Sequence, residues 1–382
     1  MRKVSLPIYF WFPVLGCVAF GTFFMNIPPV ADQFMALFGV GYAGLSFLFS
    51  ANYWTHIIFL VPGGLFVDRV GVARSLLLCL AVLIATNLAP FLAPDSLALA
   101  VAMRLVLGVV TGAAFLVMVK IIKILTPPNH VARMQGMHGA AFCLGTMLPY
   151  LYLPLAGPYG WAVAYLSGAV FCAALGLCMF RLPLDRLREK RETASPVQIW
   201  QAMKSISLSK PIWLIGCCHG FFFGTINTLG NWLPSILADT SANSTAEDWA
   251  LATGVLLLIG TLARVFSSEV MGHTSHWKLV TRTLFVVGVS YFALAFLASP
   301  VALFCLCVGM AVLSGFTFAT IFTLLFDVSP MTYLATAVGF MNMIANGINL
   351  VLIIIWGNAR EFSGGFGVGL CITGVCALGI WL

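Results

Sequence analysis

Charged residues are scarce in this sequence. Only 8% of its 382 residues are Asp, Glu, Lys or Arg, whereas 61% are hydrophobic and the mean hydropathy is +1.03. A soluble domain needs far more surface charge to stay dispersed, so this composition excludes soluble and disordered proteins. The net charge of +7 comes from short basic clusters between apolar runs. That pattern reports membrane topology and implies no nucleic-acid partner.

Enzyme motifs and a disulfide framework are also missing. The sequence has no H-E-x-x-H, G-x-S-x-G or P-loop pattern, so it predicts neither an enzyme nor a bound cofactor. All eleven cysteines fall inside apolar runs, and none lies in a predicted outer loop. We therefore expect the cysteines to pack as small apolar side chains.

The sequence does contain many apolar runs of roughly twenty residues, the length that crosses about 30 Å of hydrocarbon as a helix. Long unbroken runs favour helices over the alternating strands of a membrane barrel. We therefore expect an all-α integral membrane protein with about twelve transmembrane helices. The predicted spans are 8–30, 45–67, 76–93, 98–122, 134–155, 161–181, 211–234, 249–271, 281–299, 301–326, 334–356 and 365–382.

The basic residues predict the orientation of these spans, because Lys and Arg in short loops are retained in the cytoplasm. Nearly all of them fall on one side, including Arg69, Arg74 and the seven between Arg181 and Lys210, and only Arg360 falls on the other. We expect both termini in the cytoplasm of a multi-pass plasma-membrane protein, with the bacterial inner membrane as the first choice. A monomer is expected.

An internal repeat relates the two halves of the chain. The tripeptide Phe20-Gly21-Thr22 recurs as Phe223-Gly224-Thr225, and Gly112 and Gly315 share the same offset of 203 residues. Parallel repeats of this kind place a solute site at mid-membrane between them. The expected parts are an N-terminal six-helix bundle over 1–181, a cytoplasmic linker over 182–210 and a C-terminal six-helix bundle over 211–382.

A charged motif follows the second predicted span. Residues 64–74 read GLFVDRVGVAR, which resembles the G-x-L-x-D-R-x-G-x-x-R motif of the major facilitator superfamily, and Arg104 to Gly108 is similar to its R-x-x-x-G motif. The resemblance covers essentially the whole chain and implies the fold of that family and a secondary transporter that works by alternating access. In the second half, residues 268–273 lack the Asp-Arg pair. The residues expected to form a conformational latch are Gly64, Asp68, Arg69, Gly71 and Arg74.

The polar residues inside the spans indicate the solute. An arginine at depth in a bilayer needs a partner, a water-filled cavity or a ligand, and Arg104 and Arg264 meet this description, one in each half. No acidic residue lies centrally in the spans. This balance favours an anionic or zwitterionic solute. The spacing of Arg264 and the stretch 227–234 (NTLGNWLP) are similar to anion-carrying branches of the family. Both arginines are candidate solute contacts, and the alternative for each is a structural role, in which it bonds to helix carbonyls or pairs with Glu269 or Asp68.

The seventh predicted span carries further candidates. Gly216, Gly220 and Gly224 repeat every fourth residue, which lets another helix approach closely. The adjoining face carries His219, Phe223 and Asn227. We expect this face to point into the interior of the protein, where these side chains are candidate solute contacts. His219, His138 and His56 are candidates for a coupled proton, although an interface hydrogen bond is the favoured role for the last two. Asn342, Asn346 and Asn349 lie on one face of the eleventh predicted span. Hydrogen bonding between helices is one role for this polar face, and contact with the solute, for which Asn346 is the candidate, is the other.

Other functions stay open. A drug or cation efflux pump is disfavoured because the fifth span lacks a G-x-x-x-G-P motif, since Gly145 leads only to Pro149. A soft-metal transporter is suggested by Cys217-Cys218-His219, but consecutive helical residues point about 100° apart and cannot all bind one ion. No metal site is therefore predicted. A receptor-like member that does not transport is the remaining alternative. The expected partners are a small solute, the lipid bilayer and a coupled proton.

Overall fold

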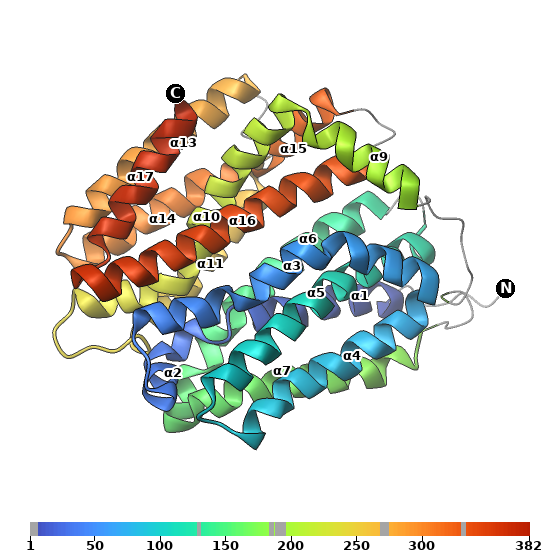
Figure 1. Ribbon diagram of the computed structural model, residues 1–382, viewed down its shortest axis with the longest axis horizontal. Coiled ribbons are helices and arrows are strands. Elements are labelled where there is room, and N and C mark those ends of the chain that lie inside the picture. Colours follow the sequence, from blue (N-terminus) through green and yellow to red (C-terminus); the bar gives the residue numbers. More distant parts are fainter. Residues whose placement is uncertain (1–6, 128–130, 183–186, 188–195, 268–274, 330–333) are drawn as a thin grey trace. The chain divides into compact units, whose positions relative to one another are not determined.

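The regular structure that is described in this protein is entirely helical (Figure 1). The computed structural model describes residues 7–127, 131–182, 187, 196–267, 275–329 and 334–382. Each of the twelve predicted spans overlaps a long helix or a pair of helices, which confirms the all-α membrane fold. Seven helical stretches among the described residues are long and apolar enough to cross a bilayer.

The main helices before the middle of the chain follow the predicted spans in order. They are α1 (Pro7–Phe24), α3 (Tyr42–Val70), α4 (Val72–Leu88), α5 (Leu97–Leu125), α6 (Val131–Tyr152) and α7 (Gly160–Met179). Two short elements, η1 (Pro28–Val30) and α2 (Ala31–Phe38), lie between α1 and α3.

The second half repeats this order after helix α9 (Pro196–Ser207), which occupies part of the predicted linker. One predicted span, 301–326, is formed by two helices that meet at Thr317. The helices are α10 (Lys210–Asp239), α11 (Ala250–Val265), α13 (His276–Phe296), α14 (Pro300–Phe316), α15 (Phe318–Val328), α16 (Leu334–Ser363) and α17 (Gly367–Trp381).

Several helices are longer than the apolar runs that predicted them. The run 211–234 belongs to a helix that continues to Asp239, and the run 334–356 to one that continues to Ser363. The hydropathy pattern detects only the part of a helix that is apolar enough to lie in the hydrocarbon core of the membrane. The backbone hydrogen bonds that form the helix extend beyond that core. The polar residues at these helix ends are therefore part of regular helix.

Contacts divide the chain into two compact units. The first unit contains Met1–Ile27 and Ala51–Thr193, and the second contains Pro28–Ser50 and Ala194–Leu382. The segment Pro28–Ser50 thus has its contacts with the C-terminal helices, although the sequence repeat groups it with the N-terminal bundle. The sequence repeat reflects the order of elements along the chain, whereas the two units are defined by which residues pack against one another. The bundle boundaries predicted from the sequence stay a prediction.

The first unit is held together by close helix packing around small residues. Helices α1 and α6 meet where a Cβ atom on Gly145 would overlap the carbonyl of Val18 and one on Gly21 would overlap that of Phe142. Without a hydrophobic driving force between helices in lipid, such close backbone approach supplies the packing energy. Phe20, Leu76, Leu83, Val117 and Cys172 belong to its buried core.

The second unit contains a long contact between α10 and α16, which lie side by side in Figure 1. The predicted glycine face of α10 is at this contact, because added Cβ atoms at Gly216, Gly220 and Gly224 would meet three side chains of α16. These are Ile344, Ile348 and Leu352, spaced by four residues along one ridge. The neighbouring face of α10, which carries His219 and Phe223, is therefore turned toward other helices.

Candidate functional site

Arg264 on α11 lies against two aromatic rings of the second unit. Its Cζ atom is 5.9 Å from the ring centroid of Phe223 on α10 and 5.3 Å from that of Phe318 on α15. The side chain is half-buried. A cation over a ring face gains about 0.5–2 kcal/mol, depending on how far it is desolvated. These two contacts help to orient the guanidinium group.

His219 joins the same cluster from one turn before Phe223. Its ring centroid lies 6.1 Å from that of Phe223, 6.2 Å from that of Phe318 and 5.9 Å from that of Phe322, and only 4% of its surface is exposed. It has a side-chain hydrogen bond with Asn342 on α16. Two predicted solute contacts, Arg264 and Phe223, and the favoured proton carrier, His219, thus come together on α10 and α11.

Phe318, the first residue of α15, lies over Arg264 where α14 and α15 meet at Thr317. At this point the Ala319 N–H donates to Ser267 Oγ at 3.3 Å, and the Ser267 hydroxyl donates to the Arg264 carbonyl at 2.6 Å. Gly315 has space for no side chain, because a Cβ there would lie 2.7 Å from the Cβ of Ala263.

The remaining predicted solute contacts bond mainly to their own helices. The side-chain amide of Asn227 donates to the Phe223 carbonyl at 2.8 Å, and that of Asn346 donates to the Asn342 carbonyl at 2.8 Å. In the same stripe, Asn349 Oδ1 accepts from Thr228 Oγ1 at 3.2 Å across the contact of α10 and α16. The predicted helix-to-helix bond is therefore present at Asn349, whereas solute contact at Asn227 and Asn346 stays a prediction.

Arg104 on α5 has protein acceptors in the first unit. One guanidinium nitrogen donates to the Phe23 carbonyl at 2.6 Å and to Asn26 Oδ1 at 3.0 Å, and the Asn26 amide donates to the Ala164 carbonyl at 3.0 Å. The arginine is 2% exposed. This network joins α1, α5 and α7, so the geometry supports a structural role for Arg104, and its contact with solute stays a prediction.

Arg104→Gln is expected to lower the thermal stability of the purified protein. The change removes charge-assisted hydrogen bonds worth about 1.5–3 kcal/mol and leaves the Phe23 carbonyl without this donor. Thermal unfolding in detergent, with Arg282→Gln on an exposed site of α13 as the control, measures the effect. Unchanged stability together with lost transport would instead assign Arg104 to the solute.

The two other histidines lie in the first unit, each beside an aromatic ring. His56 Nδ1 is 3.4 Å from Thr111 Oγ1, and its ring centroid is 5.6 Å from that of Phe24. His138 is 1% exposed, its ring lies 4.6 Å from that of Phe115, and its Nε2 has no hydrogen-bond partner among the described residues. The contact with Thr111 agrees with the interface role favoured for His56. A proton-carrying role for either histidine stays a prediction.

The predicted latch lies where α3 ends and α4 begins. Gly71 has a φ of 90°, a conformation that only glycine adopts readily, and it forms the turn between the two helices. Gly64 packs near Leu116, and the side chains of Arg69 and Arg74 are exposed. The Asp68 side chain and residues 268–273 of the second half lie outside the described part of the protein.

Sequence reasoning missed Phe318, Phe322 and Ser267. The two phenylalanines are one helical turn apart, but aromatic pairs are common in membrane helices and carry no signal by themselves. Only the packing of α15 against α11 brings Phe318 over Arg264, with Phe322 beside Phe318. Among the described residues, no group of three or more His, Cys, Asp or Glu side chains could hold a metal ion.

Comparisons with solved structures show the fold. The chain is similar to a D-xylose–proton symporter, with a TM-score of 0.78 and 15% identity over 99% of this chain and 98% of that one. It is also similar to an inward-facing bacterial homologue of the human lysosomal transporter Spinster, with a TM-score of 0.77 and 14% identity over 99% and 95%. The nucleoside transporter NupG gives a TM-score of 0.77 and 12% identity over 98% of both chains.

Two sequence comparisons add to this. A relative from Arabidopsis thaliana, named probable anion transporter 5, is 26% identical over 194 residues. The match covers 46% of this chain and 44% of the relative, so the chain matches less than half the length of that protein. The family model for the Major Facilitator Superfamily matches residues 14–352. With that match over most of its length, the chain belongs to the Major Facilitator Superfamily and is a multi-pass membrane protein.

Proposed function

We propose that this transporter moves a small anionic or zwitterionic solute by alternating access, with Arg264 contacting the negative charge. The observation that carries the proposal is the position of the Arg264 guanidinium between Phe223 and Phe318, with His219 against the same rings. A guanidinium group on a half-buried side chain attracts a negative ligand group strongly, because the surroundings screen the interaction less than water does. The partial match to a probable anion transporter supports this choice.

The aromatic rings give the site a second property. Phe223, Phe318 and Phe322 are each half-buried and surround the polar heads of Arg264 and His219. Binding sites for small molecules commonly combine apolar walls with a few polar groups that fix orientation. A carboxylate with a small apolar body therefore fits this cluster better than a fully hydrated inorganic ion.

His219 is the group we propose for proton coupling in the same site. It shares its aromatic neighbours with Arg264, so a proton on the imidazole and a negative solute would stabilise each other. The two bundles predicted from the repeat rock about this site, while Asp68, Arg69 and Arg74 latch the cytoplasmic side. The protein acts as a monomer in a plasma membrane, with the bacterial inner membrane as the first choice and both termini in the cytoplasm.

A thermal-shift screen of the purified protein tests the class of solute. The panel contains inorganic anions, carboxylates, amino acids, copper and zinc ions, and cationic drugs. A ligand that binds the folded state at a hundred times its Kd stabilises that state by about 2.7 kcal/mol. We expect carboxylates or amino acids to raise the melting temperature. Stabilisation by copper or by cationic drugs alone would overturn the proposal.

A further inference from the structure

Helix α9 (Pro196–Ser207) lies in the predicted linker, and it packs as a part of the second unit. It lies against the start of α16 and also contacts α10 (Figure 1). Its Ile206 is 2% exposed and, together with Met203, packs in the apolar cluster that contains Phe340 of α16. The inner face of α9 is therefore anchored to the helices of this unit.

The outer face of α9 carries an exposed ridge of one basic and two apolar side chains. Trp200, Lys204 and Leu208 follow one another at intervals of four residues, so they lie on one side of the helix and of the turn after it. Trp200 is 72% exposed and Leu208 is 76% exposed. No acidic residue occurs between Pro196 and Lys210. The ridge thus presents an ammonium group between two apolar side chains.

The chain that follows this ridge enters the membrane. Helix α10 begins at Lys210, the first residue of a stretch that is long and apolar enough to span a bilayer. Only Leu208 and Ser209 separate α10 from α9, so we place the ridge at the level of the lipid headgroups. Tryptophan and lysine are typical of that level, because each combines an apolar body with a polar end that reaches water.

A second tryptophan continues the ridge toward the bilayer core. The Trp213 indole N–H donates to the Ser207 carbonyl at 2.8 Å, and its ring centroid lies 5.2 Å from that of Phe340. The side chain is still 45% exposed. This bond ties the first turn of α10 to the last residue of α9, so Lys204 and Lys210 lie before and after one fixed turn.

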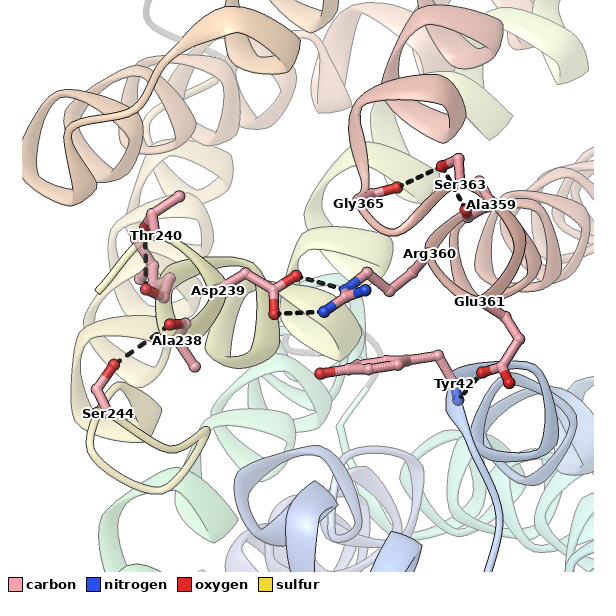
Figure 2. A network of polar contacts seen from close by, with 11 residues as sticks. Tyr42, Ala238, Asp239, Thr240, Ser244, Ala359, Arg360, Glu361, Ser363 and Gly365 are labelled. Carbon is pink, nitrogen blue, oxygen red and sulfur yellow. Dashed lines mark hydrogen bonds and ion pairs between the residues drawn. The ribbon is translucent and has the colours of Figure 1, made fainter. Parts of the chain in front are cut away.

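The two lysines differ from the arginine near the other end of α16. Figure 2 shows Arg360 in a two-point ion pair with Asp239, with Nε 2.6 Å from Oδ2 and Nη2 3.0 Å from Oδ1. Lys204 and Lys210 are both exposed, and no carboxylate among the described residues pairs with either. Their ammonium groups are therefore accessible to an anion at the membrane surface.

We propose that α9 and the start of α10 bind the headgroup of an anionic phospholipid. The ammonium groups of Lys204 and Lys210 contact its phosphate. The apolar side chains that pack against its glycerol and the first carbons of its acyl chains are Trp200, Leu208 and Trp213. This site lies on the lipid-facing surface, so the inference goes beyond the proposed transport function and does not depend on the solute.

The charge of the ridge favours a lipid over a second copy of this chain. In a two-fold symmetric dimer the same surface of both copies meets, so the lysines of the two ridges would be brought together, which is unfavourable. An anionic headgroup supplies the opposite charge instead. The bilayer around α10 holds such headgroups at the level of the ridge.

Native mass spectrometry of the purified protein tests the site by titration with phosphatidylglycerol or with phosphatidylcholine of the same acyl chains. We expect phosphatidylglycerol to bind more tightly. Lys204→Gln and Lys210→Gln should each weaken its binding by about fivefold, and the double variant by about 25-fold, as for basic residues near an anionic membrane surface. Trp200→Ala should weaken the binding of both lipids alike, because it removes an apolar contact and no charge.

Lys278→Gln is the matched control. Lys278 is also exposed, follows the exposed Trp277 and lies near the start of another span, α13. This change should leave the affinity for phosphatidylglycerol as it is. An equal loss in Lys278→Gln and Lys204→Gln would show attraction to basic groups in general and would overturn the site.

The double variant decides between the lipid and a second copy. Unchanged binding of phosphatidylglycerol would overturn the proposal, and loss of a dimer from the same spectrum would then assign the ridge to a second copy. Thermal unfolding in detergent without added lipid is expected to be the same for all these variants, because the substituted side chains are exposed.

Discussion

Arg264→Ala is expected to lower the rate of anion uptake into proteoliposomes by about a hundredfold at low solute concentration. Removing one member of a desolvated charge pair costs about 2–5 kcal/mol, and about 2.7 kcal/mol corresponds to a hundredfold in affinity. The aromatic neighbours Phe223 and Phe318 remain in place, so the variant loses the positive charge of the site and keeps its apolar walls.

Matched variants separate charge from geometry at this site. Arg264→Lys keeps the charge but not the planar group that stacks on the two rings, so we expect an intermediate loss of uptake. Arg282→Ala removes an exposed arginine of α13 and should leave uptake unchanged. Full activity of Arg264→Ala with every anion tried would refute the assignment of Arg264 to the solute.

Gly145→Ala is expected to destabilise the protein by about 2–3 kcal/mol, since overpacking at a close helix contact forces the backbone to move. A Cβ at this position would overlap the carbonyl of Val18 on α1 and would lie 3.0 Å from the Cα of Gly21 on the same helix. No flexible side chain lies there to turn away. The two helices would have to separate, which would loosen the largest helix contact of the first unit.

Gly139→Ala on the same helix is the matched control. Nothing lies within 4 Å of a Cβ at this exposed position, so the change should stabilise α6 by about 0.5–1 kcal/mol through helix propensity. Thermal unfolding can be followed with a dye that reacts with thiols, because most of the eleven cysteines become more accessible on unfolding. Equal melting temperatures for the two variants would contradict the packing argument.

The site shows where prediction from the sequence stops. The positions of Arg264, His219 and Phe223 were predictable, because a charged or polar side chain inside an apolar run is costly and therefore informative. Phe318 and Phe322 were not, since phenylalanine is as common against lipid as it is in a binding site. Their role depends on how α15 packs, with the Ala319 N–H of α15 donating to Ser267 just after α11.

The same distinction applies to Arg104 and Arg360. Both are arginines in or next to apolar spans, and the sequence suggested a solute contact for the first and nothing for the second. In the structure, Arg104 donates to Phe23 of α1 and to Asn26 just after that helix, and Arg360 pairs with Asp239 over the Tyr42 ring. Partners far apart in the sequence decide what a charge does, and no local pattern contains them.

By itself, the sequence determined the helical membrane fold and the family, because apolar runs of fixed length admit few structures in lipid and the motif of residues 64–74 is specific. Only the tertiary structure decided that Pro28–Ser50 docks on the C-terminal helices and that Arg264, His219 and Phe318 meet. The hydropathy of a residue indicates whether it prefers lipid or water. Docking and site formation depend instead on contacts between side chains of different helices, and no single run of sequence contains both partners of such a contact.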